Sequence, residues 1–290
     1  MLDFLNLDSP DEIFKQGLPH VLMARADGKA VEDDMMEFHK EIAKGFRRLS
    51  LMDDPHLAED AGALFTTGRA RSDLTKALVH SVLWNNKRPE EGNLEQVHRF
   101  FTSRSGLKKD TIDLLDWLLQ HRTPLPRIQF TEKTGPLVLH ASYTRRQVLL
   151  ALGLGSFEKP RASREGVLHV PERKLDVFFA DINKSEADFS PTTMYEDYAI
   201  NEKRFHWQSQ STTGENSPTG RRYIHHRKQK HTPLLFIRNR KKLSNGLTAP
   251  FLFAGPLTYR CHEGSRPMSI QWELEHPLPA RVLSWARPAA

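Results

Sequence analysis

Residues 189–227 read FSPTTMYEDYAINEKRFHWQSQSTTGENSPTGRRYIHHR, and this stretch sets aromatic rings among acids, amides and hydroxyls before it becomes basic. A hydrophobic core does not need so many hydrogen-bonding groups beside its rings. A pocket that stacks a planar, polar ligand such as a nucleobase does. We therefore predict a base pocket formed by Tyr195, Asp197, Tyr198, Phe205, Trp207 and Gln208.

Each of these residues has a possible structural role as well. Tyr195 and Tyr198 are three apart and fit one face of a short helix, and Trp207 fits a strand with core residues on alternate sides. Asp197 is suited to accept a hydrogen bond from an exocyclic amino group such as cytosine N4. Gln208 adds an amide to the same element as Trp207, and this favours the pocket.

The second half of the chain is basic. By our count residues 161–290 contain 20 Lys and Arg against 13 Asp and Glu, and residues 221–242 contain nine Lys and Arg with no acid. A solvated loop surface would explain this run, but its position beside the aromatic stretch favours a surface that binds a polyanion. We predict DNA-backbone contacts from Arg221, Arg222, Arg227, Lys228, Lys230 and Arg266.

Arg266 lies in a segment that we expect to link two strands. It can bind a phosphate or pair with Glu263, and the sequence does not separate these roles. Because Pro267 follows it, we predict an extended backbone at Arg266.

The composition describes a soluble globular protein. The chain has 290 residues, of which 38% are hydrophobic and 27% charged, and no uncharged apolar run reaches transmembrane length. The N-terminus is acidic, unlike a signal peptide, so we expect a cytoplasmic protein with no membrane partner. Cys261 is the one cysteine, which excludes an internal disulfide and a cysteine-based zinc site.

The hydrophobic pattern predicts an α+β fold with two domains. Apolar residues at three- and four-residue spacing predict a helical bundle over residues 1–125, with helices near 34–49, 72–84, 93–101 and 110–121. One more short helix, capped by Thr144, is expected over 144–152. Residues 140–290 contain short strands near 175–182, 233–238, 250–255 and 268–275, which predict a mainly antiparallel, barrel-like domain.

Familiar catalytic motifs are missing from the sequence. It contains no GxxxxGK[ST], GxSxG or HExxH. His225 and His226 are adjacent and would point apart on a strand, so we predict no metal site, no cofactor and no catalytic residue. Asp176, Asp181 and Lys184 are candidates for a metal-dependent nuclease, but the two acids are five apart and would face opposite sides of a strand.

Several long peptides resemble a known family. They are YTRRQVLLALG (143–153), REGVLHVPERKLDVFFADINKSEADFSPTTMYEDYAINEKRFHWQSQ (164–210), SPTGRRYIHHR (217–227) and HEGSRPMSIQWEL (262–274). They are similar to the C-terminal domain of bacterial superfamily II helicase proteins, many of which carry a phospholipase-D-like nuclease. Some of these proteins are type IV restriction enzymes that cut DNA containing methylated cytosine.

The resemblance covers residues 140–290 and implies an SRA-like (PUA-like) domain that flips 5-methylcytosine out of duplex DNA. The chain has no helicase motif and no HxK nuclease signature. The resemblance therefore implies a recognition module for a restriction or phage-defence system, with catalysis supplied by a helicase or nuclease partner. The alternatives are a metal-dependent nuclease domain, and a protein adaptor that docks onto a helicase through residues 1–120.

Overall fold

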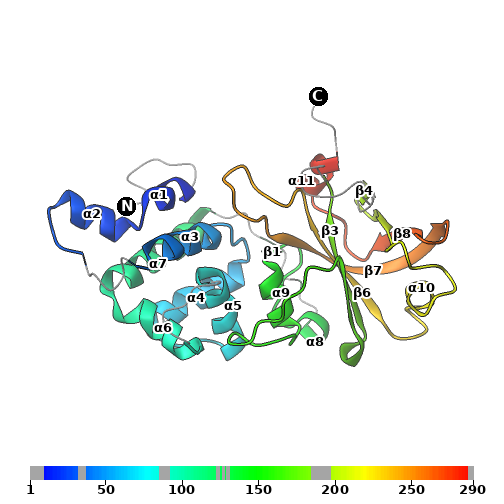
Figure 1. Ribbon diagram of the computed structural model, residues 1–290, viewed down its shortest axis with the longest axis horizontal. Coiled ribbons are helices and arrows are strands. Elements are labelled where there is room, and N and C mark those ends of the chain that lie inside the picture. The colour runs from blue at the N-terminus through cyan, green and yellow to red at the C-terminus, as the bar shows by residue number, and fades with distance from the viewer. Residues whose placement is uncertain are drawn as a thin grey trace. The chain divides into compact units, whose positions relative to one another are not determined.

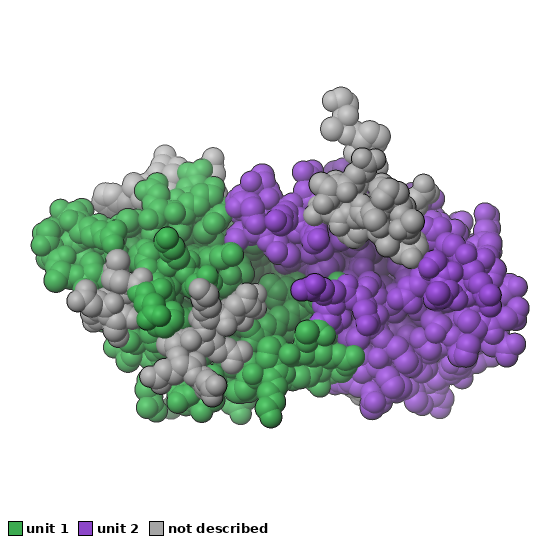
Figure 2. Space-filling model, in the orientation of Figure 1, with its two compact units in different colours: residues 1–125, 129–137, 141–162 green, residues 126–128, 138–140, 163–290 purple. Residues whose placement is uncertain are grey.

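The computed structural model describes residues 10–31, 37–84, 92–121, 125, 128, 131–183 and 197–286. The chain forms two compact units, coloured in Figure 2. The helical unit comprises residues 1–125, 129–137 and 141–162, and the sheet unit comprises residues 126–128, 138–140 and 163–290. Residues 141–162, which we had assigned to the second domain, belong to the helical unit in this division.

Short and medium-length helices build the helical unit (Figure 1). They are α1 (Asp11–Gln16), α2 (Pro19–Ala26), α3 (His39–Leu49), α4 (Pro55–Thr67), α5 (Asp73–Leu83), α6 (Leu94–Ser103), α7 (Ser105–His121), α8 (Thr131–Thr134) and α9 (Arg145–Ala151), with the two-residue strand β1 (Ser142–Tyr143). The predictions near 72–84, 93–101 and 144–152 are confirmed by α5, α6 and α9. Helix α7 begins five residues earlier than predicted.

Helix α4 was not predicted, because the Asp54-Pro55 pair resembles a loop. Instead, the Asp54 carboxylate caps the helix by accepting hydrogen bonds from the backbone N–H groups of His56 and Leu57. Pro55 occupies the first turn, where its missing N–H costs nothing. The Tyr143 hydroxyl donates to the same carboxylate. At α9 the prediction is confirmed, since Thr144 forms a capping box with Gln147.

Two histidines lie in the aromatic core of the helical unit. His80 is fully buried against Phe65 and Phe101, and its Nε2 lies 3.1 Å from Nδ1 of His98. Burial lowers the pKa of both rings from the usual 6.5, and that of His80 falls well below it. His80 is therefore uncharged in the folded protein over the whole neutral range.

This burial makes the helical unit sensitive to acid. The unfolded chain binds a proton at His80 below about pH 6.5 and the folded chain does not, so stability is complete above that pH and falls below it. At pH 5.5 the loss is on the order of 1 kcal/mol for one such histidine. His80→Phe should flatten this decline. Hydrogen exchange of the α5 and α7 amides between pH 5.5 and 7.5 measures the decline of stability in both proteins. The same slope of stability against pH in the wild type and in His80→Phe would contradict the prediction.

The sheet unit contains β2 (Val167–Val170), β3 (Leu175–Asp181), β4 (Tyr198–Asn201), β5 (Arg204–Gln208), β6 (Thr232–Arg238), β7 (Phe251–Glu263) and β8 (Ser269–Leu274). The strands are ordered β2-β3-β6-β7-β8-β5-β4. Strands β3 and β6 are parallel, and the other neighbours in this order are antiparallel. Helices α10 (Pro218–Ile224) and α11 (Ala280–Leu283) complete the unit, with 3₁₀ turns at Pro171–Arg173 and Ser284–Ala286.

The α+β class and the mainly antiparallel sheet agree with the prediction, but the described strands form an open sheet with β2 and β4 at its ends. Long strand β7 bridges its two halves (Figure 1). Its residues 252–256 pair with β6 and residues 257–263 pair with β8. Gly255, with φ of +95°, lies at the register shift, where a residue with a side chain would be strained.

Strand β3 is buried at all seven positions. It lies between β2 and β6, and its sequence LDVFFAD is a continuous run rather than an alternating one, as expected for a strand covered on both faces. Phe178 on this strand is fully buried in a core shared with Trp207, Tyr223 and Trp272. The two aspartates of β3 are buried with the rest. None of the described helices is long and apolar enough to cross a membrane.

Candidate functional site

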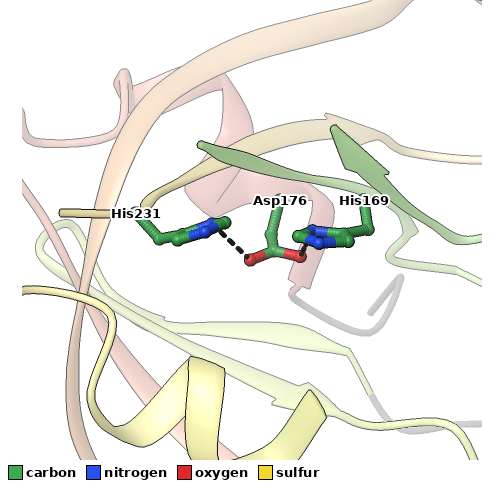
Figure 3. A group of neighbouring side chains, drawn as sticks. All are labelled: His169, Asp176 and His231. Atoms are coloured by element: carbon green, nitrogen blue, oxygen red, sulfur yellow. Dashed lines mark hydrogen bonds and ion pairs between the residues drawn. The ribbon is translucent and has the colours of Figure 1, made fainter. Parts of the chain in front are cut away.

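A buried carboxylate on β3 organises one end of the sheet unit (Figure 3). Asp176 has no exposed surface, and Arg222 of α10 donates from Nε to its two oxygens at 3.0 and 2.9 Å. His169 Nδ1 lies 3.1 Å from one oxygen and His231 Nδ1 lies 3.6 Å from the other. The β2–β3 hairpin, α10 and the segment before β6 therefore meet at Asp176.

The turn between α10 and β6 is also fixed by hydrogen bonds. The Nε2 atom of His226 accepts from the backbone N–H of Tyr259 at 3.1 Å, so its Nδ1 carries the proton and donates to the His231 carbonyl at 3.2 Å. Burial lowers the pKa of His226 and of His231, although the Asp176 carboxylate opposes the shift at both rings. Neutral His226 thus holds the turn in place.

The second aspartate of β3 is paired in the same way. Asp181 lies opposite Arg238 in the parallel β3–β6 register, and the guanidinium binds both carboxylate oxygens. Arg238 also donates to the Ala249 carbonyl at 3.3 Å, and its guanidinium lies over the ring of Phe251. Both candidate nuclease acids are therefore buried in arginine ion pairs, and Lys184 lies outside the described residues.

Two of the predicted pocket rings are core residues. Phe205 has no exposed surface and Trp207 is 4% exposed. The Trp207 indole stacks on Phe178 at 4.5 Å and meets Tyr223 edge-on. Their positions on β5 follow the alternating pattern of a half-buried strand, with the polar residues of β5 on the other face. This corrects the prediction that these two rings stack a ligand.

The other pocket residues lie at the β4–β5 edge. Tyr198 is 41% exposed and its ring stacks on His206 at 4.6 Å. Asp197 is buried and accepts from the backbone N–H of Gln208 at 3.1 Å, which joins the start of β4 to the end of β5. Tyr195 lies outside the described residues. The predicted set is thus divided between the core and a sheet edge.

The basic run is also divided. Arg222 and Arg238 neutralise buried acids, and Arg222 is corrected from a DNA contact to the partner of Asp176. The exposed cations lie at opposite ends of β6. We use the name α10 basic surface for the exposed cations before β6 together with Arg266. These residues are Arg221, Arg227, Lys228, Lys230 and Arg266. Arg240, Lys241 and Lys242 follow the other end of the strand.

Most cations of the α10 basic surface have no acidic partner among the described residues. Arg221, Lys228, Lys230 and Arg266 are exposed and have no ion-pair partner in the described part of the chain, and Arg227 donates to the Thr258 hydroxyl at 3.1 Å. Arg266 does not pair with Glu263, and its φ of +63° corrects the predicted extended backbone. The reason is a tight turn between β7 and β8, in which Gly264 also has a positive φ.

The Arg266 turn packs against the segment that leads into α10. A Cβ built on Gly214 would lie 2.8 Å from Ser265 Oγ and 3.1 Å from Arg266 Cγ, so the two segments approach closely, and a larger residue there would displace these side chains. Nearby, the Tyr259 hydroxyl lies 2.6 Å from His262 Nδ1, and His262 Nε2 lies 3.4 Å from a Glu215 oxygen. These contacts hold the cationic turn beside α10.

Sequence reasoning missed His169 and His231 as partners of Asp176. The available signal was the hairpin, because His169 lies directly opposite Asp176 in the antiparallel β2–β3 register. Only β3 of that hairpin was predicted. His231 has no comparable local signal, since it reaches Asp176 through the long parallel connection from β3 to β6.

Comparison with known proteins places the chain in one family. A model described as "Domain of unknown function (DUF3427)" matches residues 137–284, so the chain belongs to this family. The match includes every described strand of the sheet unit and α10. It also includes Asp176 with its neighbours His169, Arg222 and His231, which we call the Asp176 cluster. No curated protein matches the chain.

The Asp176–Arg222 pair should be essential for stability. Asp176→Asn leaves the Arg222 guanidinium half-buried without a counter-charge, and breaking such a pair costs about 3–5 kcal/mol. Combining it with Arg222→Met should cost less than the sum of the two single changes. Urea unfolding measures this coupling. Arg221→Met, at the neighbouring exposed arginine, is the matched control and should change stability by about 0.5 kcal/mol or less.

Proposed function

We propose that the sheet unit is a DNA-recognition module that binds duplex DNA through the α10 basic surface. The supporting observation is that this surface carries exposed cations without acidic partners among the described residues, on a helix that is fixed to β3. Arg222 is the fixed point of α10, and Asp176 holds it with two hydrogen bonds. Cations on a fixed framework can contact successive phosphates without losing much conformational entropy on binding.

The burial of Asp176 and Asp181 also supports the proposal, because their negative charges do not face a bound phosphate. An exposed carboxylate among the cations would repel phosphates, but residues 221–242 contain none. Asp176 and Asp181 are within ion pairs and have little or no surface. Among the described acids, the exposed Glu215 and Glu263 lie close in the chain to α10 and to Arg266, and they partly offset the positive charge of the α10 basic surface.

We further propose that the module reads modified cytosine, as the SRA-like resemblance implies, and does so for a helicase or nuclease partner. With Phe205 and Trp207 in the core, Tyr198 is the exposed ring of the predicted set among the described residues that could stack an extruded base, and Gln208 is the amide of that set. Stacking contributes about 1–3 kcal/mol per base, and burial of a methyl group about 0.8 kcal/mol. Preference for the methylated base should therefore be modest.

Two alternatives remain as tests. The separation of the two β3 acids favours a binding module over a magnesium-dependent nuclease, because Asp176 and Asp181 lie five residues apart on the strand, about 16 Å at 3.3 Å per residue, and cannot hold one magnesium ion together. Cleavage of methylated plasmid by the purified chain in magnesium would contradict this choice. The adaptor alternative expects a helicase partner to bind a chain truncated to the helical unit.

The α10 basic surface should control the salt dependence of binding. Replacing Arg221, Arg227, Lys228 and Lys230 with alanine should weaken binding to all duplexes and flatten the plot of log Kd against log salt, by about 0.9 per lost phosphate contact. Fluorescence anisotropy at several salt concentrations measures both effects. Replacing Arg240 and Lys242, beyond the other end of β6, is the matched control and should leave the slope unchanged. An equal effect from both sets would contradict the assignment.

Tyr198 should control selectivity and not overall affinity. Tyr198→Ala removes the exposed ring, so we expect the ratio of affinities for methylated and plain duplex to fall towards one while binding to plain DNA persists. The matched control is Ile200→Ala on the same strand, because Ile200 is also 41% exposed. Competition binding with the two duplexes measures the ratio. An unchanged ratio in the Tyr198 variant would exclude this ring from the base site.

A further inference from the structure

Three side chains that commonly bind metals converge at the Asp176 cluster (Figure 3). His169 comes from β2, Asp176 from β3 and His231 from the residue directly before β6. One donor atom of each lies within 4.8 Å of the other two. This convergence brings together residues that are up to 62 positions apart in the chain (231 − 169).

The spacing of the donors suits a small divalent ion. A tetrahedral site with bonds of about 2.0–2.1 Å has ligand atoms about 3.3 Å apart. His169 Nδ1 lies 3.1 Å from one Asp176 oxygen and His231 Nδ1 lies 3.6 Å from the other. The donor atoms of the two histidines lie within 4.8 Å of each other, so the two rings would have to move closer together for all three donors to bond one ion.

The His231 ring provides an independent indication. Its Nδ1 atom has less than 1 Å² of exposed surface and has no hydrogen-bond partner in the described part of the chain. At 3.6 Å, the Asp176 oxygen is too distant for a normal hydrogen bond. A buried nitrogen without a partner is costly, and a bound ion would supply the missing interaction.

Arg222 shares the carboxylate with the potential ion. A carboxylate has two oxygens with about four lone-pair positions, so one guanidinium nitrogen does not occupy all of them. The arginine charge lies close to the site and would weaken, but not prevent, binding of a second cation. Arg222 also orients the Asp176 carboxylate through hydrogen bonds to both of its oxygens.

We propose that His169, Asp176 and His231 form a binding site for a zinc-class divalent ion. Two imidazoles and one carboxylate favour zinc or a neighbouring transition metal over magnesium or calcium, which prefer oxygen ligands. The ion would fasten the β2–β3 hairpin to the start of β6, next to the base of α10. From the sequence we predict no metal site, because we consider His225 and His226 alone. Sequence spacing does not bring His169, Asp176 and His231 together.

Metal titration of the full chain tests the site. Tag-free protein, stripped with a chelator, should bind one equivalent of Zn²⁺ by calorimetry and unfold at a higher temperature with the ion. Co²⁺ in place of Zn²⁺ should give the visible absorption of a low-coordinate site. His169→Ala and His231→Ala should each weaken Zn²⁺ binding by about tenfold or more.

His169→Ala is the decisive variant, because the side chain is 36% exposed and its loss should leave the fold intact by circular dichroism. His225→Ala is the matched control, since His225 is exposed and close in sequence but outside the cluster, and it should bind Zn²⁺ as the wild type does. Absence of stoichiometric binding to the wild-type chain would overturn the proposal. Wild-type affinity in His169→Ala, or equal loss in His225→Ala, would also overturn it.

Discussion

The ion pair between Asp176 and Arg222 is the constraint on which the sheet unit depends. A carboxylate with no exposed surface is very unfavourable unless a cation and further donors surround it. Arg222 meets this requirement, and in doing so it fixes α10 against β3. The β2–β3 hairpin, the parallel β3–β6 pair and the turn that carries Arg227 and Lys228 all take their positions around this carboxylate.

The same interaction divides the cations by role. In the sequence, nine Lys and Arg follow one another without an acid, which looks like one continuous surface. In the structure, two of them are partners of buried acids and the rest are separated by β6, whose seven residues span about 23 Å at 3.3 Å per residue. Charge counted along a chain therefore overstates a binding face when a buried strand interrupts it.

How much of the structure can be predicted from the sequence depends on how far apart in the chain the residues that determine each feature lie. Local patterns were sufficient for α5, α6 and α9 and for the core strands, since periodicity and caps are encoded within a few residues. At residues 204–208, RFHWQ, the alternation of a half-buried strand was present, but the polar residues outweighed it and the rings were assigned to a pocket. The Asp176 cluster depends on strand register and on a long parallel connection, which a single sequence does not specify.

Arg221 and Arg222 show what this means for assigning function. They are adjacent, share a residue type and were given the same role from the sequence, yet one is exposed and the other holds a buried carboxylate. If the chain binds DNA as proposed, replacing both together would weaken binding through the loss of α10 stability as well as through the loss of the Arg221 charge. Replacing them separately distinguishes stability from recognition, because the charge at 221 is available to a ligand and the charge at 222 is already neutralised within the fold.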